Sequence, residues 1–284
     1  MTTYTHHTAP TQYIEANGIR FAYRRFGKAN GVPLLFNMHF TGTIDHWDPA
    51  LTDALANGRE VILFDNAGVG ASTGEVPTTF EGMAANAAIF VKALGLTKVD
   101  VLGFSIGGFV TQAMTELEPQ LIRKIVLVGT GPRGGEGMAT LTPEAQAIFS
   151  ATYEKPDDLW LKVFFTDSEA SQKAGQAFLK RFNARQNDRA PESNEKVAPA
   201  QLEAISKWGA PQAKPYEYLK AIKQPALIIN GSDDVIVYTV NSYHLFKNLP
   251  NAQLILYPDG NHGVQYQYPE KFAQDVANFL DWAA

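Results

Sequence analysis

The chain has 284 residues, of which 45% are hydrophobic and 19% are charged, and its formal net charge is −5. This is an ordinary globular composition, and the lack of Lys- or Arg-rich blocks argues against a nucleic-acid partner. The chain has no cysteine, which excludes disulfide bonds and is typical of a reducing compartment. No apolar run reaches the roughly 20 residues of a membrane helix, and the first residues lack a signal-peptide pattern. We therefore expect a cytoplasmic protein that does not contact membranes.

The first predicted element is a hairpin, in which Asn17-Gly18 joins the runs YIEA and IRFAYRRFG. Asn-Gly between two strand-like runs is a strong hairpin signal. Six apolar runs follow, and their lack of alternation indicates strands that are buried on both faces of a parallel sheet. These runs span residues 32–38, 60–65, 98–104, 124–130, 225–231 and 252–258.

Helical patterns separate most of these runs. Asp48 followed by Pro49 predicts the start of a helix, and Gly58 predicts its end. Other segments carry an apolar face at helical spacing. They are residues 80–96, 109–119 and 270–284. Strands and helices in alternation predict an α/β fold with a mostly parallel, twisted sheet.

Residues 131–214 interrupt this alternation, because they contain helical stretches and no good strand. The clearest helical stretches, 158–165 and 171–182, are rich in aromatic residues. The strand pattern resumes afterwards, so we expect a helical cap inserted after the sixth strand, with residues 1–130 and 215–284 forming the core. An independent second domain is the alternative.

A serine, Ser105, lies between a predicted strand and a predicted helix, in the pattern Gly103-Phe104-Ser105-Ile106-Gly107. This is the G-x-S-x-G nucleophile elbow in the structural setting that it requires. The backbone N–H of Ile106 would point to the position of an oxyanion. The alternative is a serine that only caps the helix.

A serine nucleophile needs a base, and the base needs an orienting acid. His262 follows the last predicted strand in a loop with glycines on both sides, whereas His6 and His7 lie in an N-terminal stretch that we expect to be mobile. Asp233 and Asp234 follow the preceding strand. The resulting order of serine, aspartate and histidine is a known order for catalytic triads.

With these motifs the chain resembles the α/β-hydrolase fold family, in particular its capped esterases and haloperoxidase-like members. The run DNAGVGAS at residues 65–72 resembles the family's D-x-x-G-x-G-x-S loop, and GNHG resembles its histidine loop. The resemblance covers nearly the whole chain. It implies a small-molecule substrate, no cofactor and no metal ion, and it selects Asp234 as the acid because the family's turn reads G-x-x-D.

The chain departs from the family pattern after the third strand. The family usually reads His-Gly-x there, whereas this chain reads Met38-His39-Phe40. The resemblance implies that Phe40 supplies the second oxyanion N–H, beside that of Ile106. It also brings His39 near the site, either as a substrate contact or as a packed histidine.

Two other motifs could suggest different chemistry. Residues 129–134 match the dinucleotide pattern G-x-G-x-x-G, but no helix follows to receive a pyrophosphate. Asp233-Asp234 lacks the further ligands of a metal site.

We therefore predict a serine hydrolase that cleaves an ester or lactone through an acyl-enzyme. Ser105 is the expected nucleophile, His262 the base and Asp234 the acid, and cap aromatics such as Trp160 and Phe164 would bind the apolar part of the substrate. The alternatives are carbon–carbon bond hydrolysis, perhydrolase or haloperoxidase activity, and a ligand receptor with slow turnover.

Overall fold

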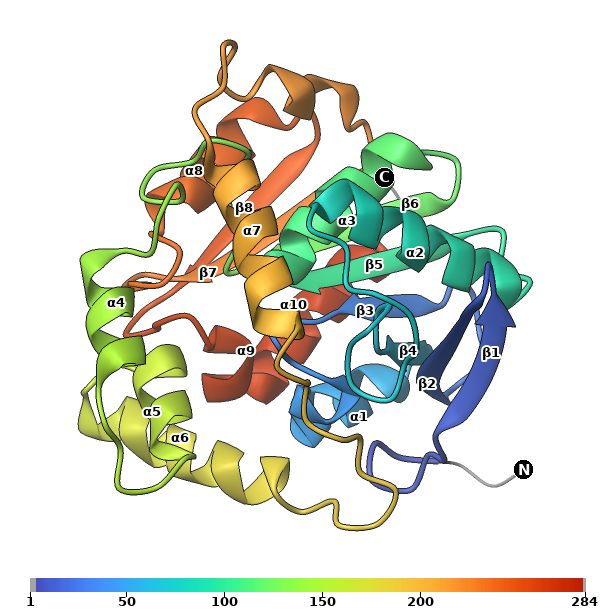
Figure 1. Cartoon of the computed structure of the whole chain (residues 1–284), viewed down its shortest axis with the longest axis horizontal. Coiled ribbons are helices and arrows are strands. Elements are labelled where there is room, and N and C mark those ends of the chain that lie inside the picture. Colours follow the sequence, from blue (N-terminus) through green and yellow to red (C-terminus); the bar gives the residue numbers. More distant parts are fainter. Residues whose placement is uncertain (1–3, 283–284) are drawn as a thin grey trace.

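A computed structural model describes residues 4–282, in which eight strands form one sheet flanked by helices (Figure 1). The strands are β1 (Gln12–Ala16), β2 (Ile19–Gly27), β3 (Leu34–Asn37), β4 (Glu60–Phe64), β5 (Val99–Phe104), β6 (Ile122–Val128), β7 (Ala226–Gly231) and β8 (Ala252–Tyr257). Their order in the sheet is β1-β2-β4-β3-β5-β6-β7-β8. Only β1 with β2 and β2 with β4 pair antiparallel, so the prediction of a mostly parallel sheet is confirmed.

The Asn-Gly turn between β1 and β2 forms as the sequence predicts. Ala16 pairs with Ile19, and the two residues between them, Asn17 and Gly18, have φ values of 50° and 74°. A two-residue turn with both residues in the left-handed region matches the twist of a hairpin.

Helices connect most of the strands. Those outside the segment between β6 and β7 are α1 (Pro49–Ala56), α2 (Phe80–Ala93), α3 (Ile106–Leu117), α8 (Val240–Asn248), α9 (Val264–Gln267) and α10 (Pro269–Asp281), with the 3₁₀ helix η1 (Ile44–His46). A second 3₁₀ helix, η2 (Glu217–Ala221), lies within that segment, just before β7. The Asp48 side chain accepts a hydrogen bond from Ala50 N at the start of α1, while Asn57, not Gly58, is the residue that ends it. Within residues 4–282, no helix is long and apolar enough to cross a bilayer.

The sheet is buried on both faces. Alternate side chains of each strand point to opposite faces, so Leu35 and Val101 pack in one apolar layer and Leu34 and Leu102 in the other. Helices α2, α3 and α8 cover the first layer, and α1 and α10 cover the second. Because both faces need apolar residues, the strands read as continuous apolar runs.

Between β6 and β7 the chain forms a helical insertion. It contains α4 (Pro143–Ser150), α5 (Asp158–Phe164), α6 (Glu169–Phe182) and α7 (Val197–Gly209). In Figure 1, α4, α5 and α6 lie together beside the sheet, whereas α7 runs back over it. The chain then returns to the sheet at β7, which pairs parallel with β6.

Two buried carboxylates, Asp45 and Asp48, attach this insertion to the rest of the chain. Arg24 donates hydrogen bonds to both carboxylate oxygens of Asp45, and its side chain is 0% exposed. The same carboxylate accepts a hydrogen bond of 2.6 Å from the backbone N–H of Ala190, which follows α6. Arg181, on α6, pairs with Asp48 at 2.6 Å.

We expect Asp45→Asn to lower the free energy of unfolding by about 3–5 kcal/mol, because it leaves the buried Arg24 charge unpaired. Asp167→Asn is the matched control, because Asp167 and its partner Lys162 are both exposed and such pairs contribute at most about 1 kcal/mol. Urea-induced unfolding of the two variants measures the difference, and equal losses would contradict the structural role of Asp45.

The N-terminal stretch is attached, contrary to the prediction of a mobile terminus. His6 is 2% exposed, and its backbone N–H donates to Asp53 Oδ1 at 2.7 Å. The Arg185 guanidinium donates to the backbone carbonyls of His6, His7 and Ala9. The residue that holds this stretch thus lies far along the chain, in the helical insertion.

Candidate active site

Ser105 occupies the turn between β5 and α3. Its φ and ψ are 56° and −121°, a conformation that costs a non-glycine residue about 1–3 kcal/mol. Ser105 N donates to Val128 O at 2.9 Å, which ties the turn to β6. The Ser105 hydroxyl makes no hydrogen bond within residues 4–282. The backbone of Ser105 is bonded on both sides, because its carbonyl also accepts a hydrogen bond from Gly108 N. Backbone strain of this kind, at a buried serine whose hydroxyl has no hydrogen-bond partner among the described residues, is typical of functional sites.

The flanking glycines permit this turn. A Cβ atom on Gly107 would overlap the backbone carbonyl of Asn37 at the end of β3, and one on Gly103 would overlap the Gly107 carbonyl. The start of α3 can therefore approach the carboxyl ends of β3 and β5 only without side chains at these two positions.

His262 and Asp234 lie in the loops that follow β8 and β7. His262 Nδ1 lies 2.8 Å from Asp234 Oδ2, and the two residues are 2% and 3% exposed. The carboxylate accepts a hydrogen bond from Nδ1–H, so Nε2 is left as the nitrogen that can accept a proton. The other oxygen, Asp234 Oδ1, accepts hydrogen bonds from Ile236 N and Val237 N at 2.9 and 3.0 Å. Every oxygen of this carboxylate is thus engaged in holding it and the imidazole in place.

The neighbouring Asp233 points elsewhere. It is exposed, and its Oδ2 accepts a hydrogen bond of 2.6 Å from the Ser232 hydroxyl. Its backbone N–H donates to Gly260 O. The geometry of the turn therefore matches the assignment of Asp234, rather than Asp233, to the histidine.

The loop of His262 has a further support that the sequence analysis missed. Asn261 Oδ1 accepts a hydrogen bond from Val235 N, and Asn261 Nδ2 donates to the backbone carbonyls of Lys162 and Phe165. Gly263 N donates to Phe164 O at 2.9 Å. The histidine loop is therefore attached both to the acid turn and to α5 of the insertion.

The segment after β3 forms a tight turn next to Ser105. Phe40 lines the same cavity as Ser105 and Ile106. Neither Phe40 N nor Ile106 N donates a hydrogen bond to another group in the part of the chain that the structure describes. Thr41 has φ 56°, which strains this turn as well.

The helical insertion holds this strained turn from both sides. Thr41 N donates to Gln201 Oε1 at 2.7 Å, and the Ser193 hydroxyl donates to Thr41 O at 2.7 Å. Gln201 lies on α7 and is 5% exposed. Two side chains from the insertion thus fix the peptide that follows Phe40, in a turn that lacks the family's usual glycine.

His39, which stands where that glycine is usual, is packed and lines a second cavity that Ser105 also borders. It is 5% exposed, and its ring lies against those of Trp160 and Phe164. Its Nδ1 lies 2.9 Å from Phe40 O, so Nδ1 carries the proton. Its Nε2 is a buried acceptor without a hydrogen-bond partner among residues 4–282. Both roles considered for His39 are compatible with this geometry.

Several buried titratable groups lie near this site or under the N-terminal stretch. Burial, assisted by the neighbouring His46, lowers the pKa of His39 to about 3. Burial likewise lowers the pKa of His46 to about 4 and that of His6 to about 3. Burial raises the pKa of Asp65 to about 7, although its carboxylate accepts hydrogen bonds from Ile44 N and Ala71 N.

These pKa values predict that the protein loses stability in mild acid. Between about pH 4 and 6 the unfolded chain binds protons at His6, His39 and His46 that the folded chain does not, whereas only the folded chain keeps the Asp65 proton. The unfolded chain thus binds about two more protons than the folded chain. The free energy of unfolding therefore falls by at most about 3 kcal/mol for each pH unit of acidification. Urea unfolding at pH 7, 6 and 5 measures this slope. His39→Gln should reduce the slope, and a stability that is constant from pH 7 to 5 would contradict the prediction.

Two cavities meet at Ser105, and we call them the wide lobe and the narrow lobe. The wide lobe has a volume of about 310 Å³ and the narrow lobe about 190 Å³. Phe40, Ser105, Phe149 and Ile236 line both. The wide lobe is also lined by Ile106, Phe109, Met138, Leu141, Leu202 and Ile205. The narrow lobe is also lined by His39, Leu159, Trp160, Val163, Phe164 and His262. All three residues predicted to bind substrate, His39, Trp160 and Phe164, therefore lie at the narrow lobe.

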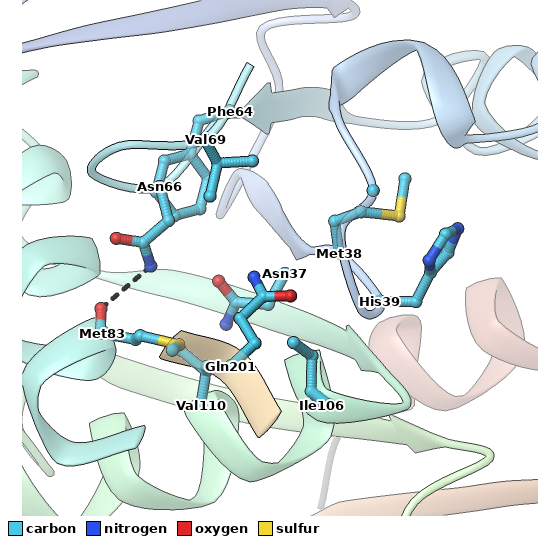
Figure 2. A pocket seen from close by; sticks show the side chains of 11 residues that line it. Asn37, Met38, His39, Phe64, Asn66, Val69, Met83, Ile106, Val110 and Gln201 are labelled. Atoms are coloured by element: carbon cyan, nitrogen blue, oxygen red, sulfur yellow. Dashed lines mark hydrogen bonds between the residues drawn. The ribbon is translucent and has the colours of Figure 1, made fainter. Parts of the chain in front are cut away.

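A third, much smaller cavity lies behind the turn (Figure 2). It measures about 30 Å³, and Met38, Asn66, Met83, Val110 and Gln201 are among its lining residues. Asn66 Nδ2 donates to Met83 O across one side of it. This volume is about that of one water molecule, so the cavity is too small for a substrate.

The G-x-G-x-x-G run at residues 129–134 has a packing role. The segment from Gly129 to Thr142 forms no helix before α4, as the sequence predicts. Gly129 has φ 51°, and a Cβ there would lie 3.1 Å from His262 Nδ1. Gly129, the first glycine of the run, thus leaves space for the imidazole of His262.

Comparison with known proteins agrees with the fold and with the resemblance. A family model described as alpha/beta hydrolase fold matches residues 32–269. The 2-hydroxy-6-oxononadienedioate/2-hydroxy-6-oxononatrienedioate hydrolase of Burkholderia vietnamiensis is 30% identical over 237 residues, which cover 80% of this chain and 79% of that protein. A Mycobacterium tuberculosis protein named provisionally as a non-heme bromoperoxidase, BpoC, is 24% identical and covers 92% of this chain and 98% of its own length.

A solved structure is similar over the whole length. An alpha/beta hydrolase fold protein from Chitinophaga pinensis has a TM-score of 0.93 and 44% sequence identity, and the match covers 99% of this chain and 100% of that one. The predicted fold class and the predicted family resemblance are thereby confirmed.

Proposed function

This chain belongs to the α/β-hydrolase fold family, and we propose that it is a serine hydrolase that cleaves a small, partly apolar carboxylic ester or lactone. One observation carries the proposal. Ser105, on a strained turn, lines the same cavity as His262, whose Nδ1 is held by Asp234 at 2.8 Å. These are the elements of nucleophile, base and orienting acid that a triad requires.

In the proposed mechanism, Ser105 Oγ forms a bond to the carbonyl carbon of the ester while His262 Nε2 accepts its proton. The N–H groups of Phe40 and Ile106 stabilise the oxyanion. The bond to the alcohol oxygen then breaks, and that oxygen takes the proton from His262. A water molecule, deprotonated by His262, cleaves the acyl-enzyme, releases the carboxylic acid and restores Ser105.

We propose that the helical insertion acts as the cap of this site. Its helices α5 and α7 contribute lining residues to the narrow and the wide lobe. Apolar walls that exclude water strengthen the electrostatic interactions with the oxyanion.

Hydrolysis of p-nitrophenyl esters and labelling with a fluorophosphonate test this function. We expect many turnovers per protein molecule and covalent labelling of one residue, Ser105. A receptor that kept the triad would release at most about one product per protein. Labelling of another residue, or no turnover of any ester, would overturn the proposal.

Carbon–carbon bond hydrolysis is the second candidate, because the Burkholderia vietnamiensis relative is named as a hydrolase of that kind of dioate. A dioate carries two carboxylates, and binding such a substrate favours cationic side chains. Neither lobe is lined by Lys or Arg in residues 4–282. This charge pattern supports the ester or lactone over the dioate.

The proposed oxyanion site makes Gln201 a positioning residue. We expect Gln201→Ala to lower kcat by about 10-fold with little change in KM. The substitution removes the hydrogen bond to Thr41 N, so the strained turn no longer holds Phe40 N–H in a fixed position. Glu203→Ala is the matched control, since Glu203 lies on the same helix and its side chain is half exposed. Steady-state kinetics of both variants give the answer, and an equal loss in both would indicate a general effect on α7.

A further inference from the structure

The two lobes differ in which catalytic groups they contain. His262 lines the narrow lobe and not the wide one, whereas Ile106 lines the wide lobe and not the narrow one. In the reaction proposed above, the departing alcohol oxygen must reach His262 Nε2 to receive its proton. The alcohol portion therefore belongs in the narrow lobe, and the acyl portion extends into the wide lobe.

The volumes of the lobes set the sizes of the two portions. Each water molecule in the liquid occupies about 30 Å³, and we use this volume for each non-hydrogen atom of a ligand. The wide lobe of about 310 Å³ then accepts roughly ten non-hydrogen atoms, and the narrow lobe of about 190 Å³ roughly six. The acyl portion is the larger one.

The chemistry of the walls gives the character of each portion. Leu141, Phe149 and Leu202 line the wide lobe and are more than 40% exposed, which leaves an apolar mouth open to solvent. The narrow lobe is walled by Trp160 stacked on Phe164, with ring centroids 5.3 Å apart. Flat aromatic walls favour a flat ring that packs against them. A charged group in either lobe would lose its hydration without finding a Lys or Arg among the lining residues within 4–282.

We infer, on the basis of the proposed function, that the substrate is a neutral ester of a medium-length apolar acid with a small aryl alcohol. The acyl chain occupies the wide lobe, and the aryl alcohol occupies the narrow lobe. The same lining excludes substrates that carry a carboxylate at the far end of the acyl chain.

Three sets of esters test this inference with the full-length protein. They are phenyl esters from acetate to dodecanoate, ethyl esters of the same acids, and phenyl half-esters whose acyl chain ends in a free carboxylate. We expect kcat/KM to peak near octanoate to decanoate. A terminal carboxylate should lower kcat/KM by at least about 100-fold relative to the neutral ester of equal length.

Variants assign the lobes. Each ratio between two substrates is compared between variant and wild type, because this comparison cancels the intrinsic reactivity of the esters. Leu202→Trp should shift the peak to shorter acyl chains, with at least about a 10-fold loss on phenyl decanoate. Trp160→Ala should lower the preference for phenyl over ethyl esters by about 10-fold and leave the peak in acyl length unchanged. Leu117→Trp, at an exposed position at the end of α3, is the control and should alter neither profile.

The outcomes separate this inference from the proposed function. The assignment of the lobes is overturned, while the hydrolase function stands, if Leu202→Trp changes the phenyl preference and Trp160→Ala the acyl-length profile, or if neither variant changes either profile. Efficient cleavage of the carboxylate-bearing esters overturns the neutral substrate class. Failure of every ester, together with no labelling of Ser105, overturns the proposed function itself.

Discussion

Replacing Ser105 by alanine should lower kcat by about 10⁶-fold and abolish fluorophosphonate labelling. The expected loss is this large because nucleophile, base and acid act as a unit, so that removing the nucleophile leaves only binding and the oxyanion site. Kinetics with a p-nitrophenyl ester measure the loss. An alanine variant that retained more than a small fraction of the activity would show that Ser105 is not the nucleophile.

A second substitution distinguishes a catalytic from a structural serine. Ser105 has φ 56°, where glycine is unstrained, so Ser105→Gly should be inactive and also more stable than the wild type by about 1 kcal/mol. Ser105→Ala keeps the Cβ atom and should have nearly unchanged stability. If the serine only capped the helix, both variants would be less stable and still active.

Features that depend on neighbouring residues could be predicted from the sequence. The Asn17-Gly18 turn, the continuous apolar strands and the elbow around Ser105 each depend on a few adjacent residues, and the structure contains all of them. The family resemblance added the register of the acid turn. That register matches the contact between Asp234 and His262, two residues that the strand order of a parallel sheet brings together.

Features that depend on pairs of distant residues could not be predicted. The contact of Gln201 with Thr41 spans 160 positions, and that of Arg185 with the His6 carbonyl spans 179. No local pattern marks either pair, because a glutamine or an arginine on a helical surface reads as a solvated residue. The N-terminal stretch was therefore wrongly predicted to be mobile, and the support that Gln201 gives to the turn after β3 was missed.

Asp234→Asn should lower kcat by about 10⁴-fold. An asparagine has nearly the same shape, but its amide can donate a hydrogen bond to Nδ1 and so favours the tautomer whose Nε2 carries the proton. That histidine cannot accept the serine proton. Asp234 Oδ1 also accepts two backbone N–H groups, so we expect some loss of stability in addition to the loss of activity.

The neighbouring aspartate provides the matched control. Asp233 is exposed, and its carboxylate is bonded to the Ser232 hydroxyl rather than to the imidazole, so Asp233→Asn should keep kcat within about twofold, as surface substitutions usually change little. Circular dichroism of both variants first establishes that they are folded, and turnover of the same ester is then compared. A dead Asp233→Asn with an active Asp234→Asn would reassign the acid by one residue. If both variants were active, the 2.8 Å contact between His262 and Asp234 would be a packing contact, and the orienting acid of His262 would have to be sought elsewhere around the cavity.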